Sequence, residues 1–376
     1  MQLCLTPVHG ERWRGYNVKY TNMGTKNTQA GMRTKIPKWV STTLVLTGVI
    51  VGVLIISASF FVREANDIIV SYADPASTGD SEDTSLPEII PFPVSVNPEK
   101  KEIAEDPALE EFVVTTIPKT DGVLSVHSSW FSKVLGKLAL MGWYQNLASL
   151  STRVLVIEPG ERKEQIVEHF AKILKWSSAD RETFLSTLQK TSPVIEEGKM
   201  FPGAYNVAVD ASPEYVAQLV AERFDAEVLS RYTPEIEMVV PLQDTLIVAS
   251  LLEREARDFD DMRHISGVIW NRLFVDMKLQ IDATLQYAKG SKPSQPWWPR
   301  VLPADKYLAS AYNTYKNEGL PPAPIANPSL EAIIGALNPV ETDCMFYFHD
   351  KKGGFHCTKT YEEHVKLLKQ YYGRGK

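Results

Sequence analysis

The feature that most constrains this chain is a run of uncharged, mostly apolar residues at 39–62. As a helix rising about 1.5 Å per residue, the run reaches roughly 36 Å, which exceeds a hydrocarbon thickness of about 30 Å. Charged residues before the run are basic apart from Glu11. Because basic flanks stay in the cytosol, we expect one transmembrane helix, with residues 1–38 as a cytoplasmic tail and everything after Arg63 outside.

A cleaved signal peptide is the alternative, since Ser57, Ala58 and Ser59 weakly resemble a cleavage site. The apolar stretch is longer than a typical signal sequence and follows a long basic tail. Both properties favour an uncleaved anchor, so the expected location is the cytoplasmic membrane, crossed once.

Residues 63–118 are acidic and rich in proline, and they lack the periodicity of a helix or a strand. Such a composition buries little apolar surface, so we interpret the segment as an extended spacer. The chain of 376 residues, 44% of them hydrophobic, has room for two folded domains beyond it. A formal net charge of −6 gives no indication of nucleic-acid binding.

Residues 119–235 are predicted to form a small α+β subdomain. A strand is expected at 153–157 and a helix at 162–174, with one apolar face. A second strand follows Phe201, and Ser212 is placed to N-cap another helix. This unit offers no catalytic cluster, so it suits a packing or binding module.

Residues 236–376 are predicted to form a mixed α+β domain that carries the chemistry. The expected elements are, in order, a helix ending near Glu253, a helix at 264–275, strands at 345–349 and 355–358, and a terminal helix from Tyr361.

Glu253 follows the apolar run 246–252, which predicts a largely buried helix with Ser250 one turn before the carboxyl. A carboxyl in that setting loses water, so its pKa should rise, as a general acid requires. The alternative is a helix-end glutamate paired with Arg254 or Arg257. This stretch alone leaves both interpretations open.

Two cysteines, Cys344 and Cys357, face the outside in the predicted topology. A disulfide between them is compatible with that compartment, but sequence does not decide its geometry. Zinc binding with His349 and His356 is disfavoured, because an adjacent His356–Cys357 pair fits no standard finger spacing. We therefore predict no metal and no other cofactor.

Five blocks in a fixed order resemble the endolytic murein transglycosylases, the YceG-like family of membrane-anchored bacterial cell-wall enzymes. The blocks are Ala249-Ser250-Leu251-Leu252-Glu253-Arg254-Glu255, Asn271-Arg272-Leu273, Leu279-Gln280-Ile281-Asp282-Ala283-Thr284, Tyr312-Asn313-Thr314-Tyr315 and Gly319-Leu320-Pro321-Pro322. The resemblance implies a LysM-like subdomain at 119–235 and a transglycosylase domain at 236–376. Ile281 and Lys278 depart from the family pattern, and the insert with Trp297 and Trp298 is unusual.

The resemblance also implies a reaction. The family cleaves the β-1,4 bond between N-acetylmuramic acid and N-acetylglucosamine within glycan strands, leaving 1,6-anhydromuramoyl ends. Hydrolytic glycosidases use two carboxylates, but here the sugar's own C6 hydroxyl attacks, so one carboxyl suffices. By resemblance Glu253 is that acid and base. The implied partners are peptidoglycan, the bilayer and, by resemblance only, cell-wall synthases.

Further residues are predicted to bind substrate or support the acid. Glu255 lies about 200° around the helix from Glu253, so both cannot point into one cleft. Asp282 is either a second carboxylate or a loop cap, and Arg272 is expected to hold one of these acids. The tyrosines either stack on sugars or pack the core. The complete supporting set is Ser250, Glu255, Asn271, Arg272, Gln280, Asp282, Thr284, Tyr312, Asn313, Thr314 and Tyr315.

Two other functions stay open at this point. A muramidase would hydrolyse the same bond with a second carboxylate such as Asp282. A non-enzymatic scaffold would bind the wall through the LysM-like part and need no acid at Glu253.

Overall fold

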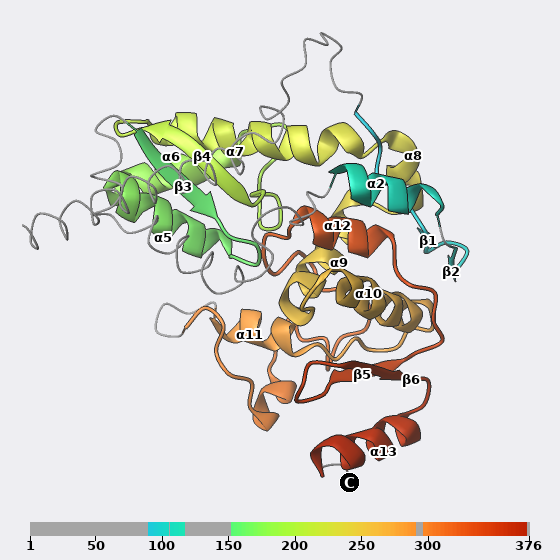
Figure 1. Cartoon of the computed structure of the whole chain (residues 1–376). Helices are drawn as coiled ribbons and strands as arrows, with labels where there is room; N and C mark the ends of the chain where they lie inside the picture. Colours follow the sequence, from blue (N-terminus) through green and yellow to red (C-terminus); the bar gives the residue numbers. More distant parts are fainter. Residues whose placement is uncertain (1–88, 105, 117–151, 291–295, 374–376) are drawn as a thin grey trace, which may run out of the picture. The chain divides into compact units, whose positions relative to one another are not determined.

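The computed structural model describes residues 89–104, 106–116, 152–290 and 296–373 (Figure 1). Within these residues, helices combine with small two-stranded antiparallel sheets, so the predicted α+β class is confirmed. None of the helices described is both long and apolar enough to cross a membrane. The predicted cytoplasmic tail and the predicted transmembrane helix at 39–62 lie outside the described residues.

Residues 89–116 differ from the expected extended spacer. Strand β1 (Val96–Asn97) pairs with β2 (Glu102–Ile103), and helix α2 (Ala108–Thr116) follows. The side chains of Phe92 and Phe112 are 4% and 2% exposed within the hydrophobic core. The prediction was wrong here because an average composition hides a few large apolar residues, and these are enough to dock a short segment.

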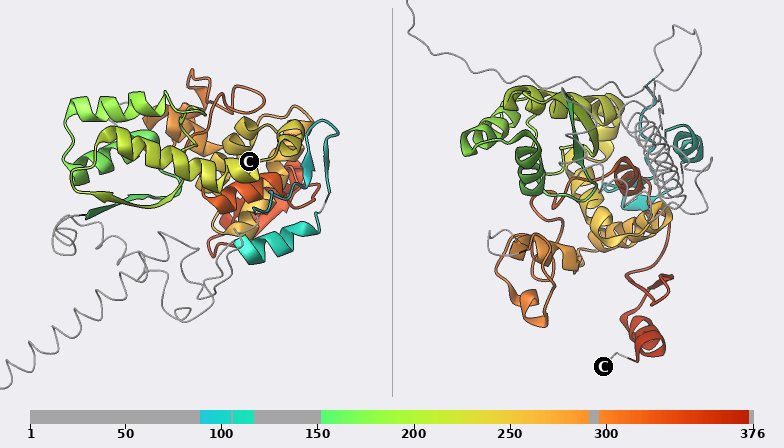
Figure 2. Two further views of the ribbon diagram at one scale, coloured as in Figure 1. Left: turned by 90° about the horizontal axis from the view of Figure 1, so that it is seen from above. Right: turned by 60° about the vertical axis from the view of Figure 1, so that its left-hand side comes forward.

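Both strands predicted in the next unit form, and they pair antiparallel, β3 (Thr152–Ile157) with β4 (Gly203–Ala208). Helices α5 (Lys163–Leu174) and α6 (Ser178–Leu188) connect the two strands, and α7 (Pro213–Glu227) follows (Figures 1 and 2). The predicted N-cap at the start of α7 is confirmed, because the hydroxyl of Ser212 accepts a hydrogen bond from the Tyr215 amide at 3.2 Å.

Helix α6 was not predicted, since only Phe184 and Leu188 on it are buried. The local signal for this helix is a capping box at its N-terminus. The Ser177 hydroxyl accepts from the Asp180 amide at 3.2 Å, and the Asp180 carboxylate accepts from the Ser177 amide at 2.8 Å. Local capping therefore specifies this helix more than hydrophobic periodicity does.

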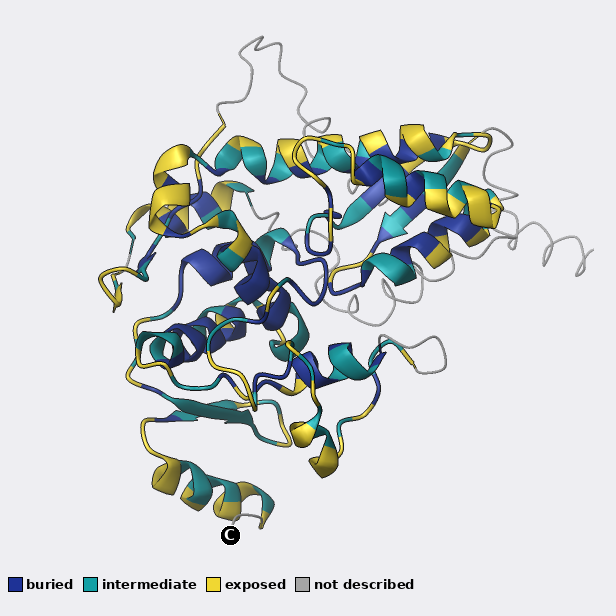
Figure 3. Cartoon of the chain, turned by 180° about the vertical axis from the view of Figure 1, so that it is seen from behind, coloured by how far each residue is buried: buried dark blue, intermediate teal, exposed yellow. Residues whose placement is uncertain are grey.

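A helical layer contains the predicted acid-bearing helix. Helix α8 (Pro234–Val239) leads to α9 (Leu242–Glu255), which packs against α10 (Phe259–Phe274) and α12 (Leu330–Leu337). Every residue of α9 from Thr245 to Leu252 is buried. Helix α10 begins earlier than expected because the Asp258 side chain caps it. In Figure 3 buried residues run through this layer.

The C-terminal elements match the prediction closely. Strand β5 (Phe346–His349) pairs with β6 (Phe355–Thr358), and helix α13 (Tyr361–Tyr372) follows with no buried residue. Two further elements, α11 (Asp282–Gly290) and the short 3-10 helix η2 (Pro303–Tyr307), precede α12 and were not predicted. A second 3-10 helix, η1, spans Leu229–Arg231.

Asn327 joins the first unit to the helical layer. Its fully buried side-chain oxygen accepts from the amides of Gly198 and Met200, at 3.0 and 2.8 Å. Its side-chain nitrogen donates to the Glu161 carbonyl and to Oε1 of Glu197, each at 3.0 Å. One side-chain amide thus bonds two loop segments, the turn at Glu161 and residues 197–200, and it fixes both against the segment that precedes α12.

The Phe112→Ala substitution tests the docking of residues 89–116. Because Phe112 is 2% exposed, its removal should lower the free energy of unfolding by about 3–5 kcal/mol in chemical denaturation. Val114 lies on the same helix and is 51% exposed, so Val114→Ala should change the free energy by less than about 0.5 kcal/mol. Equal, small effects of the two substitutions would contradict the docked arrangement.

Candidate active site

Glu253 lies near the end of α9 and contacts the start of α12. Its Oε2 accepts hydrogen bonds from the Ser329 amide at 2.9 Å and from the Ser329 hydroxyl at 2.6 Å. The same hydroxyl caps α12 by accepting from the Ala332 amide at 3.2 Å. Burial raises the pKa of Glu253, while the hydrogen bonds from Ser329 oppose this shift. The carboxyl is therefore desolvated, yet one of its oxygens is held by a helix cap.

The turn after β3 approaches this carboxyl. Gly160 has a φ of +79°, and a Cβ atom there would lie 3.5 Å from Cγ of Glu253 and 3.1 Å from a guanidinium nitrogen of Arg254. Glycine suits this position because it adopts a positive φ without strain and lets the backbone approach closely. The small α+β unit therefore contributes one wall beside Glu253.

Glu255 ends α9 in a different environment. Its carboxyl accepts from the Tyr347 hydroxyl at 3.2 Å and from the backbone amide of Ala283, in the first turn of α11. Burial raises the pKa of Glu255 to about 7, and the nearby charge of Asp282 adds to the shift. The two hydrogen bonds oppose it. The pKa of Glu255 therefore lies near neutrality, as a general acid requires.

Asp282 lies beside Glu255 as the first residue of α11, and it is exposed. Its Oδ1 accepts from the Tyr315 hydroxyl at 2.6 Å. The Lys306 ammonium lies 4.5 Å from the centre of the Tyr315 ring. A group of polar side chains therefore lies where α9 ends and α11 begins. It contains the carboxyls of Glu255 and Asp282, the hydroxyls of Tyr347 and Tyr315 and the ammonium of Lys306, and Asp282 is on its solvent side.

Several predicted site residues hold the loop before α11. Thr284 and Thr314 are buried, and their hydroxyls lie 3.0 Å apart. The Thr314 hydroxyl also accepts from the Ile281 amide at 3.0 Å. Gln280 is exposed, with a φ of +53° that is unusual for a residue bearing a side chain. The threonines position Asp282, and Gln280 projects from the loop into solvent.

Asn271 and Arg272 tie α10 to the segment around β5. The Asn271 amide nitrogen donates to the carbonyls of Thr342 and Cys344, at 2.7 and 3.1 Å. Arg272 is buried, and its guanidinium donates to the carbonyl of Met345 at 2.6 Å and to the carbonyl of Leu279. The expectation that Arg272 holds an acid was wrong, because backbone carbonyls take its donors.

The other polar predictions also have structural roles. The Ser250 hydroxyl donates to the Ile247 carbonyl at 2.8 Å and accepts from the Ile325 amide at 3.0 Å. The Asn313 side chain bonds the Lys306 and Leu308 carbonyls, at 3.1 and 2.8 Å, and accepts from the Tyr315 amide at 2.9 Å. Both side chains shape the backbone around the acids.

Tyr312 and the Trp297–Trp298 insert pack rather than reach into open space. The ring centres of Tyr312 and Tyr287 are 4.8 Å apart. The Arg254 guanidinium lies 4.0 Å from the centre of Trp298, and the Trp298 indole nitrogen donates to Gln165 on α5 at 3.1 Å. The insert therefore links α5 to the end of α9 through stacked rings and cations.

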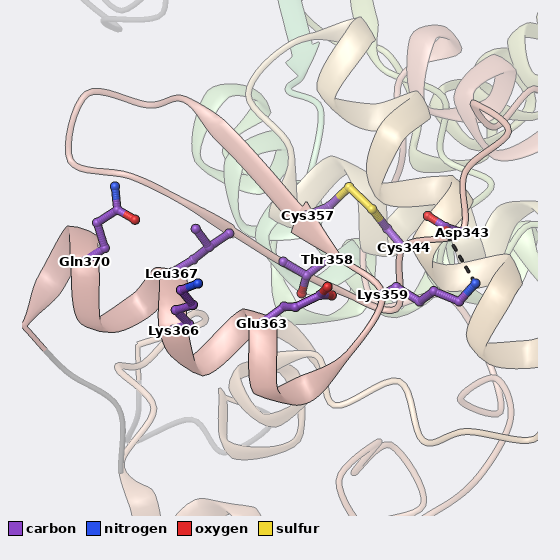
Figure 4. A pocket seen from close by; sticks show the side chains of 9 residues that line it. All are labelled: Asp343, Cys344, Cys357, Thr358, Lys359, Glu363, Lys366, Leu367 and Gln370. Atoms are coloured by element: carbon purple, nitrogen blue, oxygen red, sulfur yellow. Dashed lines mark ion pairs between the residues drawn. A yellow bond between two sulfur atoms is a disulfide. The ribbon is translucent and has the colours of Figure 1, made fainter.

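Cys344 and Cys357 form a disulfide. They line a hollow of about 580 Å³ beside α13 that contains none of the predicted site residues (Figure 4). Nearby, His349 pairs with Asp261 at 2.7 Å. His356 pairs with Asp350 at 2.9 Å. The cysteines and histidines considered for zinc therefore have other partners.

Sequence reasoning missed the distant partners of both acids. Tyr347 donates a hydrogen bond to Glu255 and lies 92 residues further along the chain. Ser329 donates to Glu253 and lies 76 residues further along. Tyr347 lies in the middle of the predicted strand at 345–349, but nothing in the sequence pairs that strand with the end of α9. These contacts depend on tertiary packing, so no local signal identifies them.

Glu197 is a third desolvated acid, outside the predicted set. It is 5% exposed, and its Oε1 accepts from the amide of Lys163 at 2.9 Å as well as from Asn327. Its Oε2 has no hydrogen-bond partner among the described residues. Burial raises the pKa of Glu197 to about 8, and the charge of Glu164 adds to the shift. The carboxyl is therefore protonated at neutral pH.

Comparisons with known proteins agree with this architecture. The model of the YceG-like family matches residues 133–370, more than half of the chain, so the chain belongs to the YceG-like family. The endolytic murein transglycosylase of Bacillus subtilis is 32% identical over 237 residues, which cover 58% of this chain and 64% of that protein. That of Streptococcus pneumoniae strain D39 is 29% identical over 205 residues, covering 50% and 37%.

A solved structure of a yceG-like protein also resembles this chain. The crystal structure of a yceG-like protein from Listeria monocytogenes matches with a TM-score of 0.50 and 28% identity. The match covers 63% of this chain and 80% of that one. This chain spans 64% of the length of the Bacillus relative and 37% of the length of the Streptococcus relative, less than two thirds of each.

The Glu197→Gln substitution should weaken the dependence of stability on pH. The carboxyl has a pKa near 4.5 in the unfolded chain and about 8 when folded. Its contribution to stability is therefore present below about 4.5 and is lost as pH rises through about 8. Melting temperatures at about pH 5 and about pH 9 should differ less in the variant than in the wild type. Glu196→Gln, at an exposed neighbour, should keep the wild-type difference. An unchanged difference in Glu197→Gln would contradict the shifted pKa.

Proposed function

We propose that this protein is an endolytic lytic transglycosylase of peptidoglycan. Its substrate is the β-1,4 bond between N-acetylmuramic acid and N-acetylglucosamine inside glycan strands, and its product is a 1,6-anhydromuramoyl end. Support comes from relatives named endolytic murein transglycosylases. The observation that carries the chemistry is a buried carboxyl with a pKa near 7 beside an exposed carboxylate.

We propose Glu255 as the general acid, with Glu253, predicted from the sequence, as the alternative. An acid catalyst must hold its proton near neutral pH and present it to the substrate. The raised pKa of Glu255 and its place beside exposed Asp282 suit that task. Glu253 also has a raised pKa, and each of the two carboxyls accepts two hydrogen bonds. Both donors to Glu253 belong to Ser329, the N-cap residue of α12, whereas Glu255 lies beside Asp282.

The proposed reaction needs one carboxyl and neither water nor a protein nucleophile. Protonated Glu255 donates its proton to the glycosidic oxygen as the bond from that oxygen to C1 of N-acetylmuramic acid breaks. The resulting carboxylate accepts the proton of the C6 hydroxyl, whose oxygen forms the new bond to C1. The proton returned to Glu255 restores the starting state. The negative charge of Asp282 raises the pKa of Glu255 and favours its protonated resting form.

A muramidase is the second candidate, and one observation favours it. Asp282 lies close enough to influence the pKa of Glu255, and a pair of neighbouring carboxyls can also hydrolyse a glycosidic bond. Mass spectrometry of the cleaved glycan distinguishes the two reactions. Anhydro ends support the transglycosylase, whereas reducing ends that carry one added water support the muramidase.

We propose that residues 39–62 anchor the chain in the bacterial cytoplasmic membrane and that the catalytic part lies outside. The disulfide between Cys344 and Cys357 supports an oxidising compartment for that part. The unit made of β3, α5, α6 and β4 is the proposed LysM-like part. Contact with cell-wall synthases remains a prediction from the family resemblance.

Glu255→Gln and Glu253→Gln form a matched pair of tests. With purified glycan strands, Glu255→Gln should lower kcat by about 10²–10⁴-fold because the proton donor is lost. Glu253→Gln should change kcat much less, since its amide oxygen can still accept from Ser329. Circular dichroism should find both variants folded. Loss of activity only in Glu253→Gln would assign the acid to Glu253, and full activity in both would refute a glutamate acid on α9.

The pH dependence of kcat/KM gives an independent test of the acid. Because Glu255 must carry a proton and its pKa is about 7, activity should be present below that value. Above it, kcat/KM should fall by about tenfold per pH unit. Initial rates on soluble glycan strands at constant ionic strength measure the profile. A profile that stays flat up to about pH 9 would contradict a donor with this pKa.

A further inference from the structure

A hollow of about 490 Å³ opens beside the acid centre. Asp282, at the start of α11, lines one part of the hollow. The remaining lining comes from η2 and the segment just before it, namely residues 301–304, Lys306 and Tyr307. The volume falls in the range of about 300–1,000 Å³ that is typical of small-molecule sites. Asp282 belongs both to this lining and to the group around Glu255, so it connects the hollow to the surroundings of the proposed acid.

Apolar and aromatic side chains on the hollow are exposed to solvent. Tyr307 is 81% exposed and Leu302 is 52% exposed. Among the described residues, no other aromatic ring packs against the ring of Tyr307. A large aromatic side chain in that position has its ring face available to a ligand.

The segment that carries Tyr307 is held in place by polar contacts. Lys289 pairs with Asp305 at 2.6 Å, and the same carboxylate accepts from the Leu302 amide at 2.6 Å. The Asn313 side chain donates to the carbonyls of Lys306 and Leu308, on either side of Tyr307. These bonds order the backbone before a ligand arrives, which lowers the entropic cost of binding.

The charges around the hollow suit a polar, uncharged ligand. Asp282 and Lys306 approach the same ring, that of Tyr315, from its hydroxyl and its face. The lining therefore offers one hydrogen-bond acceptor and one donor of opposite charge beside an apolar floor. A pyranose presents the same combination, with an apolar C–H face and hydroxyl groups around its edge.

We propose that this hollow is a saccharide subsite next to the scissile bond and that Tyr307 stacks on the sugar ring it holds. The inference rests on the proposed function for the identity of the strand. It adds a place where a neighbouring sugar of the glycan is gripped, and it makes Tyr307 a residue that binds substrate without taking part in proton transfer.

Substitution of Tyr307 tests the subsite because the side chain is exposed and its removal should leave the fold intact. Tyr307→Ala should raise KM on peptide-free glycan strands by about five- to tenfold, with kcat within about twofold of the wild type. Tyr307→Trp should restore the wild-type KM, since stacking requires a ring face and not the hydroxyl. Tyr361→Ala, at a 57% exposed position on α13 that does not line the hollow, is the matched control.

A binding measurement separates this inference from the proposed function. In a full-length Glu255→Gln background, adding Tyr307→Ala should weaken equilibrium binding of the same strands by a similar factor, and Tyr307→Trp should restore it. If the wild type cleaves no strands, the proposed function fails while the binding measurement still decides the subsite. If Tyr307→Ala binds and cleaves like Tyr361→Ala, the subsite is refuted.

Discussion

Loss of water around the carboxyls at the end of α9 is the constraint on which the account depends. The helix is buried from Thr245 to Leu252, so the residues that follow leave the core with little access to solvent. Burial raises the pKa of Glu253 and of Glu255. What separates the two acids is their partners, because Ser329 binds one to a helix cap while the other lies beside Asp282.

The rest of the fold holds this arrangement in place. Asn327 fixes the turn after β3, so that Gly160 packs against Glu253, and Arg272 fixes the loop before α11 through backbone carbonyls. The buried pair Thr284 and Thr314 then orients the start of α11, where Asp282 lies. Most of the predicted polar residues therefore act through backbone geometry, and Gln280 and Asp282 are the exposed members of the predicted set.

Much of the fold could be predicted from local signals. Periodicity located β3, α5, β5 and β6, and the serine–proline pair located the start of α7. Helix α6 and residues 89–116 could not be predicted, because a capping box and a few buried rings outweigh their polar composition. At the site, the sequence predicted Glu253 as the acid and Glu255 as a supporting residue, and this assignment stays a prediction. The choice between them depends on Ser329 and Tyr347, which tertiary packing brings from 76 and 92 residues away.

The central claim is that Glu255 holds a proton near neutral pH because its surroundings are dry. Carbon-13 NMR of side-chain-labelled glutamate measures this directly, with the Glu255 signal assigned by its absence in Glu255→Gln. The account predicts that this carboxyl titrates with a midpoint of about 7 in the folded protein. A midpoint at the ordinary glutamate value of 4.5 would contradict it.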